Sequence, residues 1–163
     1  MRGDRPGRAR AGARSSAGLG AADLVGTWLL RSWAAEGDDG SVIRPMGERP
    51  EGVLVYASDG TMITTIGEAG RAPIDGDDML AGPVDQRLAA MSSFIAYAGT
   101  YRIDGDDVLH EVTMSLFPNW VGTRQRRHIE LSQDGRILTL SSDPFVLGGQ
   151  RRTQRLTWER ASG

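Results

Sequence analysis

The chain has 163 residues, of which 19 are basic and 21 acidic, so its formal net charge is only -2. A charge so close to balance argues against a protein built mainly to bind nucleic acid or an anionic membrane. The sequence contains no cysteine and two histidines, which excludes disulfides, thiolate nucleophiles, iron–sulfur clusters and multi-histidine metal sites. Every basic residue is arginine, so no lysine is available for a Schiff base with pyridoxal phosphate or a carbonyl substrate. We therefore expect a protein without a metal or cofactor.

The first twenty-two residues differ in composition from the rest of the chain. They hold five arginines and one acid among Gly, Ala and Ser, and they lack the apolar run of a secretory signal. Because this composition is typical of disorder, we expect a disordered tail over residues 1–22 and one folded domain over residues 23–163. A lid that orders over a binding site is the alternative for the tail. No stretch of about 18 apolar residues occurs, so we expect a cytoplasmic protein that does not span a membrane.

From residue 24 onward, short apolar runs alternate with turn signals. Tripeptides such as Ser58-Asp59-Gly60 and Gln133-Asp134-Gly135 separate consecutive runs and are typical of hairpin connections. A helix is predicted after Gly82-Pro83, where apolar residues recur at helical spacing from Val84 to Ile95. The eight predicted strands are residues 24–34, 52–57, 61–66, 97–103, 108–116, 123–132, 136–142 and 150–161.

Eight consecutive strands with short connections favour an all-β fold, an eight-stranded antiparallel up-and-down barrel with one short helix. Closing the sheet removes the exposed edges that it would otherwise present. A two-sheet sandwich needs longer crossovers than this chain offers. A barrel of eight strands is wide enough to be filled by side chains or to hold one small ligand.

Several short motifs carry a resemblance to a known family. The segment Leu24-Val25-Gly26-Thr27-Trp28 looks like the Gly-x-Trp opening of lipocalins, and Leu156-Thr157-Trp158-Glu159-Arg160 looks like their closing strand. The segments Tyr97-Ala98-Gly99-Thr100-Tyr101, Phe117-Pro118-Asn119-Trp120-Val121-Gly122 and Gln125-x-Arg127 resemble the bacterial and fungal lipocalin-like domain family. The resemblance covers about residues 24–160. It implies a barrel closed at one end by Arg160 over Trp28, in a family often encoded beside natural-product genes.

Alternation along the predicted strands places several polar side chains inside the barrel. His110 and Met114 share the apolar parity of residues 108–116, and Gln125 and Arg127 share that of residues 123–132. The tyrosines expected to point inward are Tyr56, Tyr97 and Tyr101. Asn119 and Trp120 lie on a predicted loop, where Trp120 either caps the cavity mouth or covers the outside of the barrel. Trp33 is expected on the outward face of its strand. By the same parity, the residues expected to face water are Arg124, Arg126, His128 and Glu130.

Two functions from different classes fit this lumen. In the first, the protein binds an apolar natural-product intermediate and catalyses its cyclisation, isomerisation or dehydration without a cofactor. The candidate catalytic residues are then His110, Arg127, Tyr97 and Tyr101, with Gln125, Tyr56, Met114, Asn119 and Trp120 as candidate ligand contacts. In the second, the same cavity belongs to a non-catalytic carrier. A third possibility is a barrel that is filled by its own side chains and binds no ligand. We expect the protein to be a monomer or a homodimer.

Overall fold

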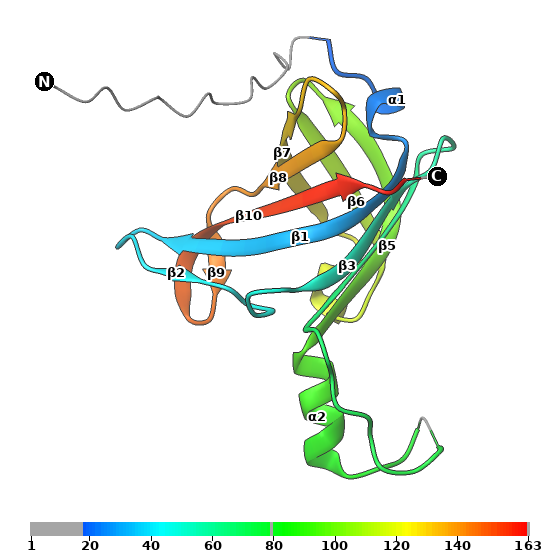
Figure 1. Cartoon of the computed structure of the whole chain (residues 1–163), viewed down its shortest axis with the longest axis vertical. Helices are drawn as coiled ribbons and strands as arrows, with labels where there is room; N and C mark the ends of the chain where they lie inside the picture. Colours follow the sequence, from blue (N-terminus) through cyan, green and yellow to red (C-terminus); the bar gives the residue numbers. More distant parts are fainter. Residues whose placement is uncertain (1–17, 79, 163) are drawn as a thin grey trace, which may run out of the picture.

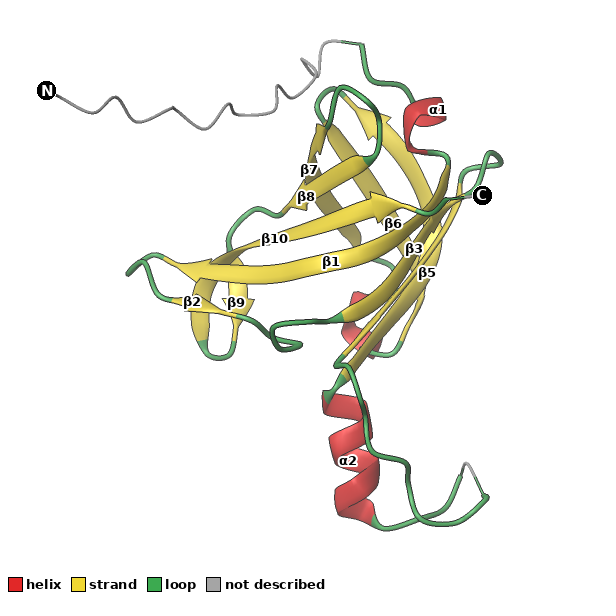
Figure 2. Ribbon diagram, in the orientation of Figure 1, coloured by secondary structure: helices red, strands yellow, loops and turns green. Residues whose placement is uncertain are grey.

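A computed structural model describes residues 18–78 and 80–162, and within them ten strands form one antiparallel sheet (Figures 1 and 2). The expected tail therefore lies outside the described residues over positions 1–17. The strands are β1 (Gly26–Gly37), β2 (Val42–Ile43), β3 (Glu51–Tyr56), β4 (Thr61–Gly67), β5 (Phe94–Asp104), β6 (Asp107–Ser115), β7 (Arg124–Leu131), β8 (Ile137–Ser141), β9 (Phe145–Leu147) and β10 (Gln150–Arg160).

Eight of these strands close into a barrel, which confirms the predicted fold class. The order runs β1-β3-β4-β5-β6-β7-β8-β10, and β10 returns to pair with β1 along a seam from Trp28↔Arg160 to Gly37↔Arg152. The two short strands β2 and β9 were not predicted, and they extend the sheet beside β1 and β10. Closure leaves the eight barrel strands without a free edge, as the prediction required.

Three helical segments accompany the barrel: α1 (Ala21–Leu24), α2 (Val84–Ser92) and the 3-10 turn η1 (Pro118–Trp120). Figure 2 shows α2 extending from one end of the barrel and α1 lying at the opposite end. The predicted helix exists, but it ends before Ile95, which belongs to β5. Val84, Leu88 and Met91 are all at least half exposed, so this stripe does not pack into the barrel core. None of the helices in residues 18–78 and 80–162 has the length and apolar character to cross a membrane.

The end of the barrel beside α1 is closed by a buried tryptophan and an arginine. Trp28 is fully buried and donates its indole N–H to the Leu24 carbonyl at 2.9 Å. The Arg160 guanidinium carbon lies 4.1 Å from the centre of the Trp28 ring. Its nitrogens donate to the carbonyls of Val25, Asp23 and Gly135. The positive φ of Gly26 (136°) and the 2.8 Å left between its missing Cβ and Arg160 explain why a glycine opens β1.

Two irregularities in strand pairing reverse the parity expected from the sequence. In β1 the register shifts between Leu30 and Ser32, so Trp33 points inward and is 4% exposed, not outward as expected. In β6 the register shifts opposite Ala98 and Gly99, so Met114 points outward and is 71% exposed, and its expected inward position is wrong. An extra residue in one strand moves every following side chain to the other face.

Candidate functional site

The barrel encloses a narrow lumen with a polar cluster on one wall. Its free volume is about 40 Å³, which is room for a few water-sized groups. Most of the interior is therefore filled by side chains, and only a small chemical group enters the deepest part. The lining residues are Trp33, Leu54, Thr64, Ile66, Ile95, Tyr97, His110, Trp120, Arg127, Leu140, Gln154, Leu156 and Trp158.

His110 lies at the centre of the polar cluster and is bonded at both ring nitrogens. The Tyr56 hydroxyl is 2.7 Å from Nε2, and the Tyr97 hydroxyl is 3.0 Å from Nδ1. Burial, assisted by the positive charge of Arg127, lowers the pKa of His110 to about 3. The imidazole is therefore neutral at physiological pH, with one nitrogen donating and the other accepting. His110 thus faces the core, as parity predicted.

The two tyrosines that hold His110 are themselves buried and keep their protons. Burial raises the pKa of Tyr56 well above its usual value of 10. Burial also raises the pKa of Tyr97, although Arg127 opposes that rise. Tyr56, His110 and Tyr97 therefore form a neutral chain of hydrogen bonds across β3, β6 and β5.

Arg127 is 8% exposed and carries the positive charge of this cluster. Its Nη1 donates to the Arg126 carbonyl at 2.8 Å, and its Nη2 lies 3.3 Å from Oε1 of Gln125. In the described part of the chain, no carboxylate lies within ion-pair distance of this guanidinium. Removing a cation from water without a counter-charge is costly, so Arg127 is not expected to add to the stability of the fold.

Three further polar atoms of the lumen residues are buried without a hydrogen-bond partner in residues 18–78 and 80–162. They are the indole N–H groups of Trp33 and Trp158 and the hydroxyl of Thr64. A buried polar group without a partner loses about 1–3 kcal/mol relative to a satisfied one. Two of these three groups only donate, so the lumen offers more donors than acceptors.

The end of the barrel opposite α1 is open and widens into two lobes that share Trp33, Ile95 and Trp120 with the lumen. The first lobe, of about 370 Å³, is polar and is lined by Gln125, Arg127 and neighbouring residues of β7 and the β8–β9 connection. The second, of about 530 Å³, is apolar and is lined among others by Leu88 and Met91 of α2. The bulk of any bound molecule therefore has to lie in this mouth.

The structure brings together part of the predicted site. His110, Arg127, Tyr97 and Trp120 all line the lumen, while Gln125 lines the polar lobe and Tyr56 reaches the lumen only through His110.

Two other predicted residues lie away from the lumen. Tyr101 donates its hydroxyl to the Ala57 carbonyl at 3.0 Å and does not line the lumen or the lobes. Asn119 is exposed and lines none of these cavities.

Sequence reasoning missed three lumen residues. Thr64 lies between Met62 and Ile66 on the same parity of β4, so the alternation that found His110 also indicates an inward Thr64. Gln154 alternates in the same way with Leu156 on β10. Trp33 had no such signal, because the bulge in β1 reverses its parity.

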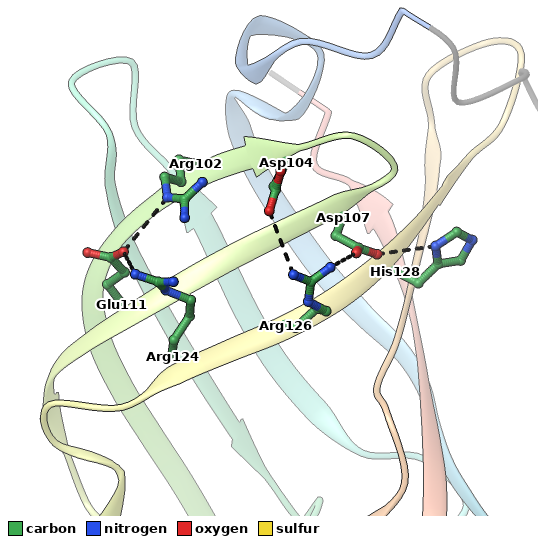
Figure 3. Close-up of polar contacts among 7 residues, drawn as sticks. All are labelled: Arg102, Asp104, Asp107, Glu111, Arg124, Arg126 and His128. Atoms are coloured by element: carbon green, nitrogen blue, oxygen red, sulfur yellow. Dashed lines mark hydrogen bonds and ion pairs between the residues drawn. The ribbon is translucent and has the colours of Figure 1, made fainter.

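The outward face of β5, β6 and β7 carries a ladder of ion pairs (Figure 3). Arg124 pairs with Glu111 at 2.9 Å, and Arg126 pairs with Asp107 at 2.5 Å. His128 lies 3.3 Å from the other oxygen of Asp107. This arrangement is a solvated strand face, as the sequence predicted for the basic run.

Comparison with known proteins agrees with this architecture. Residues 25–161 match the model of a lipocalin-like domain family. The chain is also similar to the 4'-hydroxy-3'-methoxypropiophenone carrier protein ppsC of Aspergillus oryzae, with 34% identity over 95 residues, covering 53% of this chain and 84% of the relative. The chain belongs to the lipocalin-like domain family.

Proposed function

We propose that this protein binds a small, largely apolar molecule in its barrel and carries it in a natural-product pathway. The observation that carries the proposal is the polar cluster of His110, Tyr97 and Arg127 at the base of a lumen whose mouth includes a large apolar lobe. Ligand pockets commonly combine apolar walls with a few convergent polar groups. The relative from Aspergillus oryzae supports the proposal, because its name describes a carrier of an aryl ketone.

The state of His110 favours carriage over acid–base catalysis. A general base works best when its pKa lies near the operating pH, and burial lowers the pKa of this imidazole to about 3. Both of its nitrogens are also hydrogen-bonded to tyrosines. The hydrogen bonds within the cluster already hold its side chains in place in the free protein. The cluster is therefore suited to orient a ligand oxygen.

Calorimetric titration of the full chain with 4'-hydroxy-3'-methoxypropiophenone tests the proposal. We expect saturable binding at one site. Trp120→Ala, which removes the wall shared by the lumen and both lobes, should weaken binding about tenfold. The matched control is Ile63→Ala on β4, since Ile63 is half exposed and lines none of these cavities. Absence of saturable binding of this and other small aryl ketones would overturn the proposal.

A second candidate function is cofactor-free cyclisation, isomerisation or dehydration of the bound molecule. The Tyr97 hydroxyl favours it, because it lines the lumen and, when Nδ1 of His110 carries the imidazole proton, it is free to donate a hydrogen bond to a substrate oxygen on which negative charge develops. Mass spectrometry of the molecule recovered after incubation separates the two functions. A carrier returns it unchanged, whereas catalysis predicts a product that is lost in His110→Gln while binding persists.

A further inference from the structure

The hydrogen-bonding capacity of the lumen is biased towards donors. The Arg127 guanidinium has five N–H groups, and the structure gives it neutral partners only, at the Arg126 carbonyl, the Gln125 amide oxygen and the Tyr97 hydroxyl. The indole N–H groups of Trp33 and Trp158 are buried without partners in the described part of the chain. A molecule that complements these groups has to supply acceptors.

The lumen also carries an uncompensated positive charge. No Asp or Glu is among the residues that line it, and His110 is neutral there. Asp143 lines the neighbouring polar lobe together with Arg127, but it is not within ion-pair distance of the guanidinium. The contrast with the same strand's outward face is sharp, because Arg124 and Arg126 each have a carboxylate within 2.9 Å. The two β7 arginines that face water, Arg124 and Arg126, are thus paired with carboxylates. Arg127 faces the lumen and has no carboxylate partner in the described residues.

We propose that the molecule bound in the lumen presents an anionic oxygen, as a phenolate, an enolate or a carboxylate, to the guanidinium of Arg127. This inference rests on the proposed function and specifies the chemical class of its ligand. The bound oxygen supplies the counter-charge that the chain itself does not provide, and it accepts hydrogen bonds from groups that are already desolvated and fixed.

The shape of the cavity sets the orientation of that molecule. A free volume of about 40 Å³ admits the oxygen-bearing group and excludes the remainder. The apolar lobe of about 530 Å³, lined by Leu88, Met91 and Phe117 among others, has room for the body. The molecule therefore enters with its charged group first and leaves its apolar part at the mouth.

Two matched pairs of probe molecules test whether the bound molecule carries a negative charge. The first is 4'-hydroxy-3'-methoxypropiophenone and its O-methyl ether, and the second is para-methoxybenzoate and its methyl ester. In each pair the bodies are alike, and only the first member offers an anionic oxygen. We expect para-methoxybenzoate to bind at least about tenfold more tightly than its ester at neutral pH, and the phenol to bind more tightly than its ether.

The pH dependence of binding distinguishes a phenolate from a carboxylate. As the pH rises through the pKa of the phenol, its affinity should rise by about tenfold or more in total, from that of the neutral form to that of the phenolate, while the affinities of para-methoxybenzoate and of the neutral probes stay constant. The titratable groups that face Arg127 are His110, Tyr97 and Tyr56. They keep one protonation state between roughly pH 6 and 9, because the pKa of His110 is about 3 and those of the tyrosines are raised.

The variant Arg127→Gln tests whether Arg127 is the residue that binds the anionic oxygen. It should weaken binding of the anionic probes about thirtyfold and that of the neutral probes by much less. Arg102→Gln is the matched control, because it removes the same charge from an outward, half-exposed position on β5 and should change neither affinity. Unfolding temperatures of both variants verify that they fold, and the pH dependence of the wild-type protein tests the inference without any substitution.

The possible outcomes separate this inference from the proposed function. Equal affinities of acid and ester, or an equal loss for anionic and neutral probes in Arg127→Gln, would overturn the anionic ligand and leave the carrier function intact. Failure of all four probes to bind would overturn the carrier function itself. A preference for the anions that disappears in Arg127→Gln supports both.

Discussion

The two ends of the barrel each hold an inward arginine, and the two are used differently. At the closed end, Arg160 stacks on Trp28 and donates to three backbone carbonyls. Towards the open end, Arg127 donates to one carbonyl and lies at a long 3.3 Å from one amide oxygen. The closed end thus satisfies its cation with its own chain, while the open end leaves part of the donor capacity and the charge of Arg127 without a partner in the described residues. The comparison separates a guanidinium that holds the fold from one that we propose binds a ligand.

The largest expected effect is at the closed end, where Trp28→Ala should lower the free energy of unfolding by about 3–5 kcal/mol. Trp28 is fully buried, and its loss removes both its packing and the face on which Arg160 lies. Chemical denaturation measures the change. Trp120→Ala at the open end is the comparison, and because Trp120 is partly exposed its loss should be less than about 2 kcal/mol. Similar losses at both ends would contradict the division of roles.

The next effect is the pH dependence contributed by His110. Its pKa in the folded protein is about 3, below the 6.5 of a free imidazole, so the unfolded chain binds a proton that the fold excludes. The penalty is absent above about pH 6.5 and grows as the pH falls towards 3. The free energy of unfolding should therefore fall by about 1.4 kcal/mol for each pH unit between about pH 6 and 4.5.

Urea denaturation across that range in the wild-type protein and in His110→Gln measures this contribution. The variant should lose the slope while the wild-type protein keeps it. The range avoids the carboxylates of Asp39, Asp59 and Asp134, whose pKa values are lowered and which titrate at lower pH. Parallel slopes in the two proteins would show that His110 is charged or accessible in the fold.

An effect that differs between the two ends is expected when each arginine becomes methionine. Arg160→Met leaves three carbonyls without donors and should lower the free energy of unfolding by about 2–4 kcal/mol. Arg127→Met removes a buried charge that has no carboxylate partner in the described residues, so stability should stay within about 1 kcal/mol or rise. Thermal and urea unfolding of both variants measure these changes. A large loss of stability in Arg127→Met would show that Arg127 contributes to the stability of the fold.

The smallest effect is expected on the outward face of β7. Arg126→Gln removes the pairs with Asp104 and Asp107, both partly exposed to solvent, and should change the free energy of unfolding by less than about 1 kcal/mol. That difference should shrink as salt is added, because exposed pairs are screened. A salt-independent loss would indicate that the ladder shown in Figure 3 contributes by packing rather than by charge.

Much of the fold could be predicted from the alternation of apolar and polar residues and from the turn sequences between strands. The eight barrel strands lie within a few residues of their predicted ranges, because hairpin connections and apolar alternation are local properties of the sequence. The inward positions of His110 and Arg127 followed from the same alternation. The short strands β2 and β9 escaped prediction, since two or three residues carry too little pattern.

Two of the errors in residue orientation have one physical cause, a bulge in a strand. Trp33 and Met114 lie just beyond the register shifts in β1 and β6, and each therefore occupies the opposite face from the one its parity predicted. A signal for the second bulge was present in Gly99, because a glycine inside a strand often marks an irregular pairing. A Cβ on Gly99 would lie 1.9 Å from the Glu111 carbonyl oxygen, so only glycine permits this approach.

The β1–β10 seam has a kinetic consequence. Every other pairing in the barrel joins strands that are close along the chain, whereas this one brings the Ala161 N–H to the Thr27 carbonyl at 2.8 Å across almost the whole domain. Its closure is the step with the highest entropic barrier, and until it occurs β1 and β10 present two complementary open edges. At high concentration a second copy competes for those edges, so slow closure during refolding should yield intertwined dimers that exchange β10.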